Sequence, residues 1–249
     1  MKISTIAVGV ALAAMLPLGA HALTLDLTSV DAFGTINGAY FQQTGQQPTG
    51  TGYIDSFVEI IDNADIVEAY NTTVNDVLDN GSSDEFNHEL LVSELPVVAI
   101  DHGLYYQFLL DIDQTGADPY ISLDEIQIFV SDTPNQSVDT FSGDLLDLAD
   151  ASRVYQLDAG GDNWIWLDYS LNSGSGSGDM FMYVPTSVIT GGDYVYLYSR
   201  FGENYEANDG FEEWAIIAGQ DNIIPEPATM VLMVTGLAGI FCFRRKTRV

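Results

Sequence analysis

The chain has 249 residues and a formal net charge of −29 at pH 7, because 36 acidic residues are set against only seven basic ones. Residues 23–224 carry 35 of the acids but only two basic residues, Arg153 and Arg200, which excludes nucleic acid and anionic lipid as partners of this region. The single cysteine, Cys242, excludes an internal disulfide, so core burial or bound ions must hold the fold together.

The N-terminus has the three parts of a secretory signal peptide. Lys2 gives a positive start, residues 6–18 are apolar, and Ala20-His21-Ala22 fits a small-x-small cleavage site. We therefore predict a signal peptide over residues 1–22, cleaved after Ala22, and export through the Sec machinery. A transmembrane anchor is the alternative, but the apolar stretch is short and a cleavage site closes it.

The body of the chain alternates strand-like runs with turn signals, and no long stretch has a helical period. The runs are rich in β-branched and aromatic residues, and clusters of Gly, Asn and Asp separate them. The clearest runs are residues 53–61, 104–112, 121–130, 164–169 and 194–198. We predict an all-β fold for residues 23–221, a single acidic domain built as an antiparallel, jelly-roll-like β-sandwich.

Three segments between these runs need separate interpretation. Residues 142–151 have leucines at helical spacing, and residues 185–189 begin with a proline that suits a first helical position, so both are interpreted as short helical turns. Residues 172–178 are a flexible Gly/Ser segment, which we interpret as a long hairpin loop within the domain.

The acidic run that begins at Asp111 is the best candidate for a metal site. Asp111, Asp113 and Gly116 occupy positions 1, 3 and 6 of a calcium-binding loop. Position 12 is Ser122 instead of glutamate and the flanks look like strands, which excludes an EF-hand. We expect Asp111, Asp113 and Asp118 to bind Ca²⁺ in a β-hairpin loop, with an ordinary acidic turn as the alternative. No other cofactor is predicted.

Two further patterns point to binding. Residues 158–163 form an acidic, glycine-containing loop that is a weaker calcium candidate. Trp164 and Trp166 share one face of a strand, and so do Tyr194, Tyr196 and Tyr198. Exposed rings on a sandwich face would stack on sugars, whereas buried rings would supply core area, and both interpretations are open.

Motifs of enzymes are missing from the body. There is no G-x-S-x-G motif and no phosphate-binding loop, and the body contains no lysine at all. His88-Glu89 begins like a zinc-binding H-E-x-x-H motif, but Val92 stands where the second histidine is required. Close pairs of carboxylates are expected by chance among so many acids, so they do not indicate a glycosidase. We predict no catalytic residues and a protein that is not an enzyme.

The last 25 residues have a different organisation. Pro225-Glu226-Pro227 precedes an apolar run at residues 228–243. This run would form a transmembrane helix of roughly 24 Å, short of the ~30 Å hydrocarbon core, and snorkelling side chains and local thinning would close the gap. A basic tail at residues 244–249 places this end in the cytoplasm and the body outside. The tail contains Arg244, Arg245, Lys246 and Arg248.

A Pro-Glu-Pro motif, an apolar segment and a basic cluster in this order resemble the PEP-CTERM sorting signal of Gram-negative bacteria, here over residues 222–249. The resemblance implies an exported protein that is held transiently in the inner membrane, processed by exosortase, and then delivered to the cell surface or outside the cell. The body is also similar to a β domain shared by a group of such proteins, which implies no activity. That similarity covers residues 50–58, 108–113, 120–125, 158–164 and 167–172.

From these patterns we expect a structural or adhesive protein of the cell surface or extracellular matrix, associated with exopolysaccharide or biofilm. A carbohydrate- or calcium-binding β-sandwich module is the alternative, and a secreted hydrolase is the third choice. A binding module requires exposed aromatic rings beside a cleft, and a hydrolase requires two carboxylates facing each other in a pocket. A structural protein requires neither.

Overall fold

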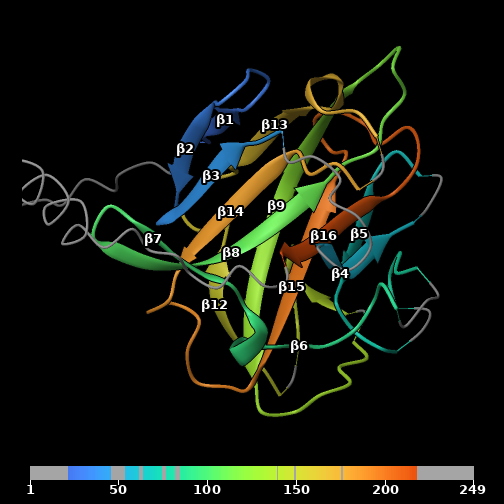
Figure 1. Cartoon of the computed structure of the whole chain (residues 1–249). Coiled ribbons are helices and arrows are strands. Elements are labelled where there is room, and N and C mark those ends of the chain that lie inside the picture. The colour runs from blue at the N-terminus through green and yellow to red at the C-terminus, as the bar shows by residue number, and fades with distance from the viewer. Residues whose placement is uncertain are drawn as a thin grey trace, which may run out of the picture.

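A computed structural model describes residues 22–45, 54–61, 64–74, 77–81, 85–138, 140–148, 150–174 and 176–217 (Figure 1). These residues form two seven-stranded sheets and one two-stranded sheet, and the expected all-β class is confirmed. None of the helices in this part of the chain has the length and apolar character needed to cross a bilayer. The predicted sorting signal at 222–249, and all of the predicted signal peptide except Ala22, lie outside the described residues.

The first sheet, sheet A, has the strand order β1-β13-β9-β15-β5, with β12 also paired to β9 and β6 to β15. Its strands are β1 (Thr24–Asp26), β5 (Val67–Tyr70), β6 (Leu90–Leu91), β9 (Tyr120–Ser131), β12 (Ser152–Gln156), β13 (Trp164–Asp168) and β15 (Tyr194–Phe201). The β1–β13 pair is parallel, and the other pairs of this sheet are antiparallel.

The second sheet, sheet B, has the order β2-β3-β14-β8-β16-β4, with β7 also paired to β8, and all its pairs are antiparallel. Its strands are β2 (Phe33–Ile36), β3 (Ala39–Gln43), β4 (Ile54–Ile60), β7 (Val97–Ile100), β8 (Gly103–Asp111), β14 (Met180–Pro185) and β16 (Glu212–Ile217). The small sheet is β10 (Phe141–Ser142) with β11 (Leu145–Leu146), and the two 3₁₀ turns are η1 (Val92–Glu94) and η2 (Tyr169–Leu171).

The main core lies between sheets A and B. Figure 1 shows strands of sheet B, among them β8 and β14, crossing over β9 and β15 of sheet A. The alternation predicted for residues 121–130 is confirmed, because Ile126, Ile128 and Val130 all point into this core. Phe108 and Leu110 on β8 meet them from the other sheet. Each such side chain contributes about 1.5–3 kcal/mol when it leaves water, so the alternating pattern fixes which face of each strand turns inward.

A second, smaller core covers part of the outer face of sheet A. Phe129, Tyr196 and Tyr198 are buried there against the β10–β11 hairpin. Gln127 holds the hairpin in place: its Nε2 donates to the Asp144 carbonyl (3.0 Å), and its Oε1 accepts the Leu146 N–H (3.1 Å). The prediction of a helix over residues 142–151 is therefore wrong. The leucine spacing suits a helix, but the chain turns back at 143–144 and pairs as strands, with a glycine at positive φ in the turn.

Two other interpretations also need correction. Residues 172–178 are not a hairpin loop, because they connect β13 in sheet A to β14 in sheet B. Residues 186–188 form a turn after β14 instead of a helix, and Pro185 is the last residue of that strand. In both cases local composition suits several conformations, and the sheet that the next strand joins decides among them.

Candidate functional site

The predicted calcium loop begins at the end of β8, where Asp111 is buried. Its Oδ2 accepts the backbone N–H of Gly176 at 2.6 Å, so the Gly/Ser connection folds over this carboxylate. Burial raises the pKa of Asp111 to about 7, and the neighbouring charges of Glu213 and Asp113 add to the shift. The position is therefore an interior carboxyl group, not a solvated turn residue.

Asp118, the third expected ligand, is exposed in the turn that follows. Its backbone N–H donates to the Thr115 carbonyl (3.1 Å), and its carbonyl accepts from Asn208 Nδ2 (2.9 Å). Within the described ranges, no group of three or more His, Cys, Asp or Glu side chains is arranged to hold a metal ion. Calcium binding by Asp111, Asp113 and Asp118 stays a prediction.

A β-bulge in β9 turns two consecutive acids to the outer face of sheet A. Leu123 and Ile126 both point into the main core although they are three residues apart. The register with β15 slips at this point, because Arg200 pairs with Glu125 and the next residue, Phe201, pairs with Leu123. Asp124 is the extra residue, so Asp124 and Glu125 share the outer face. A bulge re-aims side chains in this way without breaking the sheet around it.

Strand pairing along the other edge of β9 is interrupted opposite the bulge. β12 and β13 both pair with β9, one after the other along its length, and the loop 157–163 leaves the sheet between them. Asp158 lies in this loop, and its Oδ1 accepts the Asn163 N–H at 2.8 Å. The loop that was a weaker calcium candidate therefore brings an acid toward Glu125.

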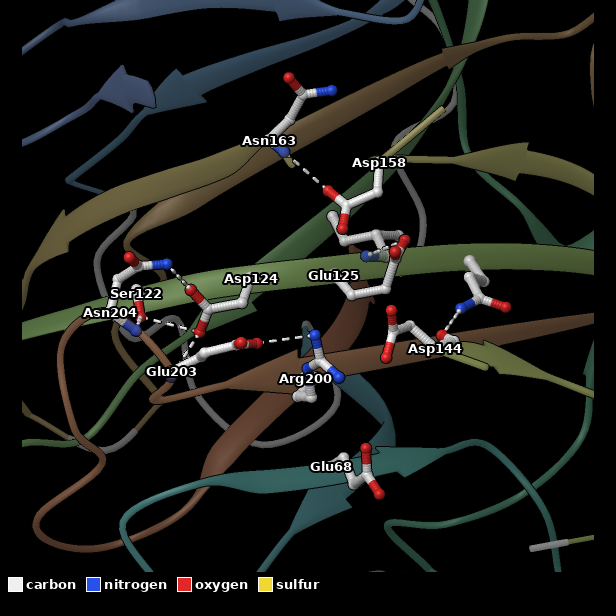
Figure 2. A network of polar contacts seen from close by, with 12 residues as sticks. Glu68, Ser122, Asp124, Glu125, Asp144, Asp158, Asn163, Arg200, Glu203 and Asn204 are labelled. Atoms are coloured by element: carbon white, nitrogen blue, oxygen red, sulfur yellow. Dashed lines mark hydrogen bonds and ion pairs between the residues drawn. The ribbon is translucent and has the colours of Figure 1, made fainter. Parts of the chain in front are cut away.

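These irregularities frame a cavity of about 550 Å³, called here the acidic cleft. Its charged lining consists of five carboxyl groups and one guanidinium. Figure 2 shows Glu125, Asp144, Asp158 and Glu203 around Arg200. The carboxyl groups come from β9, the β10–β11 turn, the loop after β12 and the loop after β15. The lining residues that carry charge are Glu125, Asp144, Asp158, Asp162, Arg200 and Glu203.

Glu125 and Asp158 are neighbouring carboxyl groups of the cleft, and burial raises the pKa of both. The pKa of Glu125 rises to about 8; the charge of Asp158 adds to the shift, and the Gln156 side chain opposes it. The pKa of Asp158 rises to about 6. Glu125 Oε1 accepts the Ile126 N–H (3.0 Å), whereas its buried Oε2 has no hydrogen-bond partner among the described residues.

Arg200 is the basic residue of the cleft, and it is already paired. Its Nη2 lies 2.7 Å from Glu203 Oε2 in a partly exposed ion pair. Glu68 lies on the far side of Arg200 in Figure 2 and accepts a hydrogen bond from the hydroxyl of Tyr198. Burial raises the pKa of Asp158 by more than the charge of the guanidinium lowers it, so this pKa stays raised.

Ser122 and Asp124 fasten the loop that follows β15 onto this face. Asp124 accepts the Glu203 N–H (2.7 Å) and the Asn204 Nδ2 (2.8 Å), as Figure 2 shows. Ser122 Oγ accepts the backbone N–H groups of Asn204 (3.0 Å) and Tyr205 (2.9 Å). Both anchoring side chains are buried, so the loop has a defined position.

Tyr205 is thereby placed over the tryptophans of β13. Its ring stacks on Trp166 with centroids 4.8 Å apart and an interplanar angle of 19°, and it lies 5.8 Å from Trp164. Tyr120 completes the group at 5.5 Å from Trp166. Tyr120 and Tyr205 are 37% and 36% exposed, and the two tryptophans are partly exposed. We call these four residues the aromatic platform.

The platform and the acidic cleft adjoin on one face of sheet A. Trp166 is the cross-strand partner of Ser122, and Ser122 also anchors Tyr205. Glu203 lines the cleft and Tyr205 belongs to the platform, so two residues of one loop connect them. The sequence predicted that the two tryptophans share one face and that the loop 158–163 is a candidate site, but it indicated neither the two tyrosines nor the other residues of the cleft. In the sequence, only the three-residue spacing between the apolar residues Leu123 and Ile126 indicates the bulge.

The tyrosines of β15 do not join the platform. Tyr196 and Tyr198 are fully buried in the second core, which decides in favour of core packing for them. Tyr194 packs against the same cluster.

A model of the PEP-CTERM protein-sorting motif matches residues 224–246, inside the segment predicted from the sequence. No curated protein and no solved structure matches the chain. This motif directs exported proteins through a membrane-anchored intermediate to processing by exosortase. The chain is therefore a PEP-CTERM domain-containing protein.

Proposed function

We propose that the exported body is a non-enzymatic component of the cell surface or extracellular matrix that holds exopolysaccharide on its aromatic platform. The observation that carries the proposal is the stack of Trp166 and Tyr205, exposed beside a cleft on a protein with an export signal. The apolar face of a sugar ring packs on such rings, which supply a large apolar contact area.

The arrangement of the cleft supports binding over hydrolysis. Glycosidases hold their two carboxyl groups about 5–9.5 Å apart, so that a sugar bond and a water fit between them. Glu125 and Asp158 instead lie next to each other, as their mutual effect on pKa indicates, and Glu125 is fully buried. Tyr120 and Tyr205 of the platform are exposed, so a long polymer can reach them.

The proposal is tested by affinity electrophoresis of the purified body in gels that contain exopolysaccharide from the producing strain. We expect the wild type to be retarded, and Trp166→Ala and Tyr205→Ala to weaken retention about tenfold, which corresponds to about 1.4 kcal/mol. Tyr105→Ala is the matched control, since Tyr105 forms an aromatic pair with Tyr40 (5.4 Å) on sheet B, away from the platform. A wild type that migrates freely, or a Trp166→Ala protein retarded equally, would overturn the proposal.

Calcium binding at the end of β8 is the second candidate function. Three buried side-chain oxygens there lack hydrogen-bond partners: Asp111 Oδ1, Gln114 Oε1 and Asp179 Oδ1. They belong to one neighbourhood. Burial and then the charge of Asp111 raise the pKa of Asp179. The charge of Asp111 also acts on Glu212, whose Oε1 accepts a hydrogen bond from Gln114 Nε2 (3.2 Å). Carboxylate and amide oxygens are the ligands that Ca²⁺ prefers.

A further inference from the structure

The acidic cleft has more negative charge than the protein itself neutralises. Five carboxyl groups line it, and its one guanidinium, that of Arg200, is paired with Glu203. The body contains no lysine, and its other arginine, Arg153, is not among the lining residues. Buried or half-buried carboxyl groups without a cation must take up protons or bind a cationic ligand.

Glu125 shows where a ligand donor would bind. Its side chain is fully buried yet lines the cleft, and Oε2 has no donor from the protein. The buried Oε2 can therefore accept a hydrogen bond from one donor of a ligand. An ammonium group supplies three N–H donors and a positive charge, so it would satisfy Glu125 Oε2 and also pair with the Asp158 carboxylate.

The platform decides what kind of molecule carries the ammonium group. Glu203 of the cleft and Tyr205 of the platform are two residues apart, so the two parts lie within about 7 Å along the chain. A ring that stacks on Trp166 and Tyr205 would place its neighbour in a polymer over the cleft. A basic peptide gains charge pairing from the cleft but has no sugar ring for the stack.

We propose that the platform and cleft together bind a polysaccharide with free amino groups, one sugar stacking on Trp166 and Tyr205 while a protonated amine enters beside Glu125 and Asp158. This inference rests on the proposed function and names its glycan class. An anionic polysaccharide would be repelled by the five carboxyl groups, and a neutral one would leave Glu125 Oε2 without a charged donor.

Calorimetric titration of the purified body at about pH 6 tests the inference with four probes: a glucosamine hexamer, its N-acetylated counterpart, a glucuronate oligomer and a lysine hexapeptide. We expect the glucosamine hexamer to bind at least about tenfold more tightly than the acetylated one, and the glucuronate not at all. Raising salt from about 0.05 M to 0.5 M should weaken binding of the glucosamine hexamer but not of the acetylated one, because salt screens charge pairing.

Asp158→Asn and Glu125→Gln keep the shape of each side chain and the one acceptor oxygen that bonds the backbone, so both should fold, and thermal melting verifies this. Each should weaken the glucosamine hexamer about tenfold and leave the acetylated hexamer unchanged. Asp144→Asn, at the exposed hairpin turn, should weaken it less. Asp193→Asn is the matched control, since Asp193 is an exposed acid outside the cleft.

The outcomes separate the two proposals. If the acetylated hexamer binds as tightly as the amine and Trp166→Ala abolishes both, the glycan class is wrong but the platform stands. If a lysine hexapeptide binds as tightly as the glucosamine hexamer and Trp166→Ala leaves both unchanged, the cleft is a general cation site and the inference is overturned. If neither any oligomer nor the native exopolysaccharide binds, the proposed function fails as well.

Discussion

Replacing Asp111 by Asn should stabilise the protein at alkaline pH, which is opposite to the usual effect of altering a buried polar residue. Asp111 is buried, and burial raises its pKa from 3.8 to about 7. Asparagine keeps an oxygen for the Gly176 N–H and carries no charge, so it removes the cost of ionising the site. Its amide also donates to neighbouring carboxyl groups.

The magnitude follows from the pKa shift and its sign. The folded-state pKa lies above the unfolded value, so Asp111 contributes stability that is present below about pH 4 and lost as pH rises through about 7. A shift from 3.8 to about 7 corresponds to about 4 kcal/mol at about 1.4 kcal/mol per unit. We expect about half of this, about 2 kcal/mol, for Asp111→Asn at about pH 8, because the site relaxes around the charge.

Urea unfolding in EDTA at about pH 4 and pH 8 measures this. Near pH 4 the two proteins should differ by less than about 0.5 kcal/mol, because Asp111 is then protonated in the folded state. Asp118→Asn is the control: it lies in the same acidic run but is exposed, so it should change stability by less than about 0.5 kcal/mol at both values. If Asp111→Asn destabilises the protein at pH 8, or if wild-type stability rises over this range, the burial argument is wrong.

Three other predictions concern the ends and the charge of the chain. Intact-mass analysis of the native protein should show a chain that starts at Leu23 and lacks the segment after Pro227; a retained C-terminus in cells with active exosortase would contradict this. The melting temperature of the body should rise with salt, because counterions screen the repulsion between the acids. If Asp111 and its neighbours bind calcium, millimolar Ca²⁺ should raise the melting temperature more than Mg²⁺ does at equal ionic strength. Equal effects of the two ions would show that these acids do not form a calcium site. Changing the four basic residues of the tail to Gln should leave export normal but let unprocessed protein accumulate on immunoblots, because the Pro-Glu-Pro motif is no longer held at a fixed position relative to the membrane. Pro227→Ala should have the same effect, because the motif loses its extended conformation. If both variants are processed at the wild-type rate, the tail is a simple membrane anchor.

The strands were predictable because each buries one face or both. Residues 121–130 alternate and are flanked by turn signals, and they form the central strand β9 as expected. The hairpin at residues 141–146 was not predictable, because its place depends on Gln127, a buried polar residue on another strand. Leucines at 145, 146 and 148 suit either structure until that contact is known.

The candidate site was predictable only where local geometry determines it. Trp164 and Trp166 had to share a face, because side chains alternate along a strand. In the sequence, Tyr120 lies at least 44 residues from the tryptophans and Tyr205 at least 39 residues from them. No local sequence signal therefore indicates that these rings meet. Which of the aromatic faces is exposed depended on the β10–β11 hairpin, which covers Tyr196 and Tyr198 and leaves the tryptophans uncovered.

Glu125 and Asp158 were unpredictable for a related reason. The bulge in β9 turns Glu125 outward, and the interruption between β12 and β13 brings Asp158 to it. Among 36 acids no sequence feature marks Glu125, and the pattern of the acidic loop 158–163 does not reveal that Asp158 meets it. The pair arises where irregularities in neighbouring strands coincide.

Intrinsic tryptophan fluorescence tests the central claim most directly, because two of the three tryptophans belong to the platform and the third, Trp214, is fully buried. Exopolysaccharide is titrated into the purified body while acrylamide quenching is measured, with co-sedimentation reporting binding independently. We predict that bound exopolysaccharide protects Trp164 and Trp166 from acrylamide, and that Tyr205→Ala reduces this protection. Exopolysaccharide that sediments with the protein while quenching stays unchanged, or that does not sediment with it at all, would contradict the account.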